Sequence, residues 1–94
     1  MGFYRVSLDA EQDVTRLYLY GLKRYGEAQA DRYFNGLYQQ FERIADHPLL
    51  YPVDNVRERY RRCPYRSDVI YYRIVGDAVE ITAILGRQDR EQWL

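Results

Sequence analysis

The sequence is poor in the residues that build disulfides, metal sites and acid–base centres, because its 94 residues include one cysteine and one histidine. A single cysteine, Cys63, cannot form a disulfide within the chain, which is typical of a reducing compartment, and we expect a cytoplasmic protein. With His47 as the single histidine, the usual set of zinc ligands is missing, and we predict no metal and no other cofactor. A catalytic Cys–His pair would have to consist of these two residues, whereas a lone cysteine is more commonly a small hydrophobic residue.

Long hydrophobic runs are also missing. No apolar stretch approaches the ~18 residues that a membrane-spanning helix requires. The N-terminal segment MGFYRVSLDAEQD lacks the hydrophobic region of a signal peptide. Since 47% of the residues are hydrophobic and 30% are charged, we expect one soluble globular domain over residues 1–94.

Hydrophobic residues recur at helical spacing in two consecutive stretches. The first follows Ser7 or Asp9 as N-cap and ends at Gly26, and the second begins near Glu27 and stops before Pro48. A link this short predicts an antiparallel helical hairpin, with Gly36 explained by close approach of the two helices. We expect five aromatic residues of the two stripes in the core: Tyr18, Tyr25, Tyr33, Phe34 and Phe41.

The segments around these helices favour strands. FYRVS is interpreted as a short first strand, and DHPLLYPVDN, with two prolines, as a loop. From Val56 the residues alternate, so that Arg57, Arg59 and Arg61 would share one side of an extended segment, and CPYRS is interpreted as a turn. DVIYYRIV and AVEITAILG then flank Gly76-Asp77, which is a two-residue hairpin signal.

The turn of this hairpin sets a register. If Val75 faces Ala78, then Arg73 faces Glu80, and one face of the strand pair is uniformly apolar. The residues predicted to pack on the helices are Ile70, Tyr72, Ile74, Val79, Ile81 and Ala83. The same register places Arg66 opposite Arg87, where an anionic partner would relieve the repulsion between like charges. The predicted fold is therefore α+β with the order β-α-α-β-β-β, in two layers: an antiparallel sheet packed on an N-terminal helical hairpin.

Several short motifs follow one another along the chain. They are the first-helix residues Ser7, Ala10, Asp13-Val14 and Leu17, the inter-helix turn YGEAQADRYF, the helix end IADHP, and the closing strands YRRC and VIYYRIVGDAVEITAILGRQD. Together with the order of the elements, these motifs resemble the ParE branch of the RelE/ParE toxin superfamily. The resemblance covers nearly the whole chain, and two departures are Asp68 and Gly86, which stand where family members often carry histidine.

The resemblance implies a function. ParE-like proteins are toxins of type II toxin–antitoxin modules, each held inactive by a ParD-like antitoxin whose C-terminal segment wraps over it, and they are generally linked to inhibition of DNA gyrase. RelE-like relatives of the same fold cut mRNA on the ribosome. We therefore expect a gyrase-inhibiting toxin, with a ribosome-dependent mRNA endonuclease and a non-toxic binding module as the alternatives.

Arginine is concentrated between Val56 and Arg73, where six arginines meet two acidic residues in a chain of zero net charge. Such a run creates a local positive field and suits bidentate pairing with carboxylates or phosphates. A solvated edge strand, protected by its charges from aggregation, is the alternative interpretation. The predicted partner-binding residues are Arg57, Arg59, Arg61, Arg62, Arg66 and Arg87, with Trp93 as an anchor. Arg73 is expected to pair with Glu80 across the strands.

Catalysis is disfavoured by the sequence. An endonuclease needs a general base and a general acid within reach of the scissile phosphate. RelE-like nucleases typically place tyrosine or histidine after the last strand, and this chain has GRQD there. Glu58 could act as a base, but no acid partner is evident, and His47 precedes a proline at a helix end, where a capping or surface role is expected. We therefore predict a protein that acts by binding.

Overall fold

The elements follow one another in the predicted order. The computed structural model describes residues 2–86, which contain two helices and four strands. The elements are β1 (Phe3–Val6), α1 (Leu8–Tyr25), α2 (Glu27–Asp46), β2 (Arg61–Tyr65), β3 (Asp68–Val75) and β4 (Ala78–Leu85). Neither helix of the described residues is long and apolar enough to cross a membrane.

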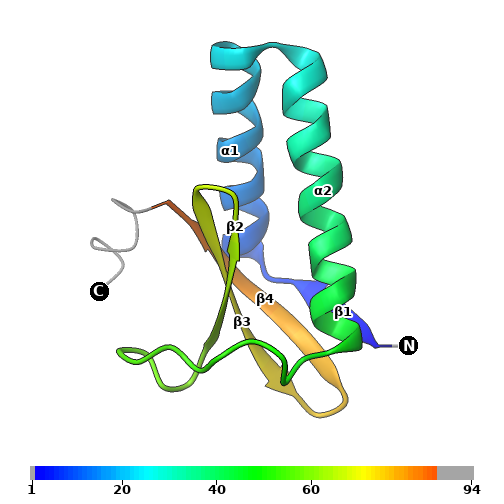
Figure 1. Cartoon of the computed structure of the whole chain (residues 1–94), viewed down its shortest axis with the longest axis vertical. Helices are drawn as coiled ribbons and strands as arrows, with labels where there is room; N and C mark the ends of the chain where they lie inside the picture. The colour runs from blue at the N-terminus through cyan, green and yellow to red at the C-terminus, as the bar shows by residue number, and fades with distance from the viewer. Residues whose placement is uncertain (1, 87–94) are drawn as a thin grey trace.

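The strands form one sheet in the order β1-β4-β3-β2, with the helical hairpin packed on one face, as Figure 1 shows. The predicted α+β class, two-layer architecture and element order are confirmed. β2, β3 and β4 are antiparallel, whereas β1 runs parallel to β4, so the sheet is mixed. The physical reason is that β1 and β4 are joined through the helical hairpin, β2 and β3 rather than through a tight turn. The end of the hairpin where α1 meets α2 projects past the sheet (Figure 1).

Residues next to α1 in the sequence determine where this helix begins and where it gives way to α2. Ser7 is the N-cap of α1, and its hydroxyl accepts a hydrogen bond from the Ala10 N–H at 3.1 Å. Gly26 lies between the two helices with a φ of 91°, in the region that favours glycine, and its N–H donates to the Leu22 carbonyl. The chain therefore reverses within one residue, which keeps α1 and α2 antiparallel and adjacent.

The main core lies between α2, the start of α1 and the inner face of the sheet. Phe41 and Ile44 of α2 meet Ile70 and Ile81 of the sheet, and all four side chains are fully buried. The other buried members of this cluster are Ala10, Val14, Leu37, Cys63, Tyr72, Val79 and Ile84. Of the five aromatic residues predicted for the core, Phe41 is buried and three are partly buried, but Tyr25 is 55% exposed because α1 ends beyond the sheet.

The register of the β3–β4 hairpin is as predicted near its turn and shifted beyond it. Arg73 faces Glu80 and Tyr72 faces Ile81, but Tyr71 faces Ala83, so Thr82 is the extra residue of a β-bulge. Beyond the bulge, the side chains of β4 that face the helices are the ones that the predicted register had turned away from them. Ile84 therefore joins the main core, while Ala83 packs in a second cluster with Tyr71. The prediction that Ala83 packs on the helices was therefore wrong.

Side chains of α1 and of its N-cap hold the bulged part of β4. β1 ends at Val6, and beyond it the Asp13 carboxylate accepts the Ile84 N–H at 3.0 Å, while the Ser7 hydroxyl donates to the Thr82 carbonyl at 3.1 Å. These bonds satisfy backbone groups that a longer β1 would otherwise pair. Near the turn of the β3–β4 hairpin, Ile74 is 41% exposed, so its prediction as a core residue was also wrong.

The arginine-rich segment is only partly a strand. Residues 56–60 form turns, because the buried Asp54 carboxylate accepts the N–H groups of Val56 and Arg57 at 3.1 and 2.7 Å. The strand begins at Arg61, and the predicted turn CPYRS is shortened to Arg66-Ser67, with Cys63–Tyr65 inside β2. The close approach at Gly36 is made by the Tyr65 hydroxyl of β2 rather than by α1.

Candidate partner-binding surfaces

The arginines of the run do not form one row. Arg61 points to the helix side of β2, and its guanidinium donates to the Tyr51 carbonyl at 2.7 Å. Arg57 is half-buried, lies 4.0 Å from the Asp54 carboxylate and stacks over the Tyr71 ring at 5.7 Å. Both side chains therefore support the loop between α2 and β2, while Arg59 and Arg62 remain exposed to a partner.

Four arginines gather on the face of the sheet opposite the hairpin. Arg62 is paired with Tyr71 in the β2–β3 register, so both side chains lie on the face over which Arg57 stacks. Farther across the sheet, Glu80 accepts hydrogen bonds from Arg73 at 2.8 Å and from Arg5 at 3.1 Å. We call this surface the basic sheet face; its residues are Arg5, Arg57, Arg62 and Arg73.

The ion pairs of this face leave an excess of positive charge. One carboxylate, Glu80, is shared by two guanidiniums, and its side chain is 15% exposed while those of Arg5 and Arg73 are 60% and 44% exposed. The predicted Arg73–Glu80 pair is confirmed, and Arg5 is a third member that the sequence analysis missed. The parallel pairing of β1 with β4 could have identified Arg5, had the partner of β1 been predictable.

Arg66 lies apart from the basic sheet face, in the turn between β2 and β3. Its φ is 54°, which a side-chain-bearing residue rarely adopts. Its guanidinium lies over the rings of Tyr33 and Tyr65, at 5.8 and 5.7 Å from their centroids. The contact with Tyr33 attaches the turn to α2, whereas Tyr65 is the residue that precedes Arg66 at the end of β2.

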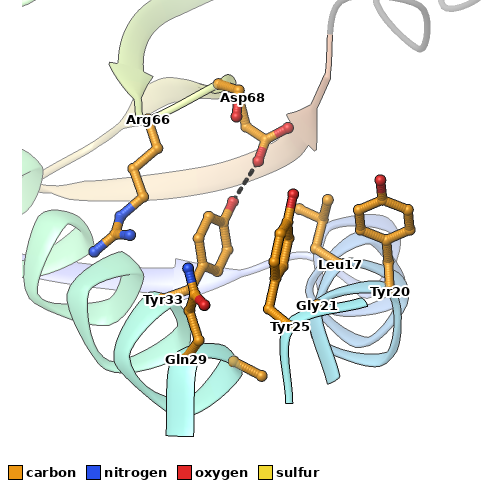
Figure 2. A pocket seen from close by; sticks show the side chains of 10 residues that line it. Leu17, Tyr20, Gly21, Tyr25, Gln29, Tyr33, Arg66 and Asp68 are labelled. Carbon is orange, nitrogen blue, oxygen red and sulfur yellow. Dashed lines mark hydrogen bonds between the residues drawn. The ribbon is translucent and has the colours of Figure 1, made fainter. Parts of the chain in front are cut away.

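A cleft of about 480 Å³ opens between this turn and the projecting end of the hairpin (Figure 2). Its walls come from three places in the sequence, and we call it the tyrosine cleft. The lining residues that matter here are Tyr20, Gly21, Tyr25, Tyr33, Arg66 and Asp68. The Tyr33 hydroxyl donates to the Asp68 carboxylate at 2.6 Å, and burial together with this bond raises the pKa of Tyr33 well above its usual range.

The outer edge of β2 offers few groups to an added strand. The Arg62 N–H already donates to the Pro52 carbonyl at 3.0 Å, and Pro64, the next residue facing the same way, has no N–H. An edge without free donors is a poor template for strand addition. A partner at this end of the molecule must therefore bind mainly through side chains.

The residues considered for catalysis, Cys63, His47 and Glu58, lie in different settings. Cys63 is fully buried beside Gln40 and Tyr51, and burial raises the pKa of its thiol. His47 is exposed at the end of α2, and Glu58 is exposed in the turn before β2. Among residues 2–86 no group of three or more histidine, cysteine or acidic side chains is placed to hold a metal ion. Arg87 and Trp93 lie outside the described residues.

Three comparisons place the chain among known proteins. The family model described as the ParE toxin of the type II toxin–antitoxin system parDE matches residues 4–91. Toxin ParE1 of Caulobacter vibrioides is 41% identical over 83 residues, which cover 87% of this chain and 85% of that protein. A solved structure entitled "Chromosomal ParDE TA system from P. aeruginosa" superposes with a TM-score of 0.81 over 92% of this chain and 96% of that chain, at 14% identity, and shows the shared fold.

Proposed function

Because the chain belongs to the ParE toxin family of type II toxin–antitoxin systems, we propose that it inhibits DNA gyrase and that a ParD-like antitoxin neutralises it. The family match extends over nearly the whole described fold, from β1 to β4. It supports a toxin rather than a non-toxic module that happens to share the fold.

The proposed partners are inferred mainly from the basic sheet face. It holds Arg5 and Arg73 around one shared carboxylate and Arg57 and Arg62 farther across the sheet, so it attracts carboxylates or phosphates. An antitoxin with an acidic segment fits this surface through carboxylates. A topoisomerase engaged on DNA fits it through acidic side chains or phosphates at the same positions, which would make the two partners compete.

We further propose that the toxin acts by binding and not by catalysis. Glu80, the carboxylate on the basic sheet face, accepts hydrogen bonds from Arg5 and Arg73, which occupy both of its oxygens. Tyr71 on the same face is buried and stacked under Arg57. An endonuclease would need a proton donor and acceptor exposed to substrate there. A binding toxin needs only different affinities for two states of its target.

Induced expression tests this function. We expect induced cells to filament and to mount a DNA damage response while bulk mRNA stays intact, and co-expression of the adjoining open reading frame to restore growth. With purified toxin, supercoiling by gyrase should fall or cleaved DNA should accumulate. Codon-positioned mRNA cuts on ribosomes with gyrase unaffected would instead establish the endonuclease alternative.

A further inference from the structure

The tyrosine cleft has a composition that neither the core nor the proposed gyrase contact explains. Its floor is formed by Leu17, Gly21 and Ala30, and its sides by Tyr20, Tyr25 and Tyr33. Figure 2 shows the tyrosine side chains pointing from the hairpin toward the β2–β3 turn, from which Arg66 and Asp68 reach back. The volume of about 480 Å³ is enough for one or two large side chains and falls within the range of ligand pockets.

Gly21 is the clearest sign that the cleft is kept open. Glycine in a helix interior is unfavourable relative to alanine. A Cβ at this position would lie 3.7 Å from the Ala30 Cβ, which is an ordinary contact, so the packing of α1 on α2 does not require glycine. What a side chain at residue 21 would take up is space in the floor of the cleft.

The charges of the cleft are arranged at its rim. Within the lining, Arg66 and Asp68 balance each other, and Asp68 already accepts the Tyr33 hydroxyl. Arg66 is stacked on the Tyr33 ring, and Arg24 on the Tyr25 ring at 5.7 Å. Stacking holds the Arg66 guanidinium by its flat face and leaves its N–H edge able to bind a carboxylate. The Arg24 Nε donates to the Tyr25 hydroxyl at 3.3 Å, so Arg24 would bind a carboxylate through its terminal NH2 groups. The interior therefore suits an uncharged apolar group, and the rim suits acidic neighbours.

We propose that the tyrosine cleft receives one large apolar side chain of the antitoxin, with carboxylates flanking that side chain paired to Arg24 and Arg66. This inference rests on the proposed neutralisation by an antitoxin and names the site at which it occurs. Tyrosine walls supply apolar area with polar tips, as in buried anchors of protein interfaces. An acidic, amphipathic segment presents both required groups within one helical turn or a few extended residues.

The edge of β2 lacks free N–H donors, which favours a partner that binds through a side chain over one that adds a strand to the sheet. Because Pro64 and the bonded Arg62 N–H leave no donor there, a partner lying near the β2–β3 turn gains little from backbone pairing. An anchor in the adjacent tyrosine cleft provides the affinity that backbone pairing cannot.

Filling the cleft tests the proposal. The variants are Gly21→Ala and Gly21→Leu, which raise helix propensity while occupying the floor, and Arg66→Asn, which removes the rim charge at a position where asparagine tolerates positive φ. Thr15→Ala is the matched control, since it raises helix propensity on the exposed side of α1, away from the cleft. Affinity for the purified product of the adjoining open reading frame is measured by calorimetry, with thermal unfolding as the folding check.

We expect Gly21→Leu to bind at least about tenfold more weakly and Gly21→Ala less so, because an overfilled site must exclude the anchor or deform. Arg66→Asn should weaken binding and flatten its salt dependence. Thr15→Ala should bind like the original chain. In cells, Gly21→Leu should remain toxic and escape neutralisation.

Two outcomes overturn the proposal while leaving the proposed function standing. Unchanged affinity in Gly21→Leu and Arg66→Asn would show that the antitoxin does not use the cleft. Loss of growth inhibition by a folded Gly21→Leu that still binds the antitoxin would assign the cleft to the target. If the original chain itself fails to bind the product of the adjoining frame, both the proposed neutralisation and this inference fall together.

Discussion

Tyr72 couples the core to the loop that follows α2. Its ring is fully buried among the aliphatic residues of the sheet, and its hydroxyl donates to the Pro48 carbonyl at 2.7 Å. Burial raises the pKa of this hydroxyl to about 12, because the ionised form cannot be solvated there. The folded state therefore holds the Tyr72 proton at pH values where the unfolded chain releases it.

This difference predicts how stability depends on pH. The pKa of Tyr72 in the folded protein is above its unfolded value of about 10. The stabilisation that the protonated hydroxyl gives the folded state is therefore complete below pH 10 and is lost as pH rises through 12. A shift of this size corresponds to about 2–3 kcal/mol of unfolding free energy. Chemical denaturation at pH 8, 10 and 11.5 should show that the free energy of unfolding falls less steeply with pH for Tyr72→Phe than for the original chain.

The control for this prediction is Tyr20→Phe, whose ring is 58% exposed. Tyr72→Phe should also lose about 1 kcal/mol at neutral pH, because the Pro48 carbonyl loses its donor. If Tyr72→Phe and Tyr20→Phe decline with pH as steeply as the original chain, the Tyr72 hydroxyl does not titrate in a buried site.

At the level of elements, the β3–β4 hairpin shows how one inserted residue redistributes side chains. The period-two pattern holds from Val75 to Tyr72 and then shifts at the bulge, so β4 contributes to the main core on one face of the sheet and to a smaller cluster on the other. Ile81 is completely buried against the helices. Ile74 belongs to the same face of the facing strand, but it is exposed because the helical hairpin does not cover that end of the sheet.

A matched pair of substitutions separates these two isoleucines. Ile81→Asp places an unpaired carboxylate in the core and should cost several kcal/mol of unfolding free energy, about 4 or more. Ile74→Asp, at a position 41% exposed, should cost about 1 kcal/mol or less. Thermal unfolding followed by circular dichroism measures both. A soluble, cooperatively folding Ile81→Asp protein would refute this core.

For the whole molecule, the distribution of charge matters more than its sum. The chain has 14 basic and 14 acidic residues, yet the face opposite the helical hairpin presents four arginines, of which Arg5 and Arg73 share Glu80. Charges at the surface act over roughly 8–10 Å at physiological salt, so this face attracts an acidic partner although the protein is neutral.

The arginines of the run should separate into two classes. Replacing exposed Arg59 and Arg62 together by glutamine should lower antitoxin affinity and reduce its salt dependence, with the unfolding temperature unchanged. Arg61→Gln should instead lower the unfolding temperature, because the Tyr51 carbonyl loses a charged donor at 2.7 Å. Affinity at two salt concentrations, together with thermal unfolding of each variant, distinguishes the classes. Equal affinity in the Arg59 and Arg62 double variant would make the run a solvated edge.

Much of the fold was predictable from the sequence, because it depends on short-range signals. The caps at Ser7 and Gly26, the two helical stripes and the Gly76-Asp77 turn set the helices, the hairpins and the Arg73–Glu80 pair. Each signal acts between residues a few positions apart, where side-chain period and backbone preference decide the conformation.

The sites depended on tertiary structure. Arg57 and Arg61, which were predicted as partner contacts, also contact the α2–β2 loop, because Asp54 turns the chain and Tyr51 supplies a carbonyl. The bulge at Thr82 is held by bonds from Ser7 and Asp13, about 70 residues away in sequence. The tyrosine cleft unites the helix junction with the β2–β3 turn. Alternation and helical spacing carry no information on such pairings, because a contact between distant segments is set by the packing of whole elements rather than by their own periodicity.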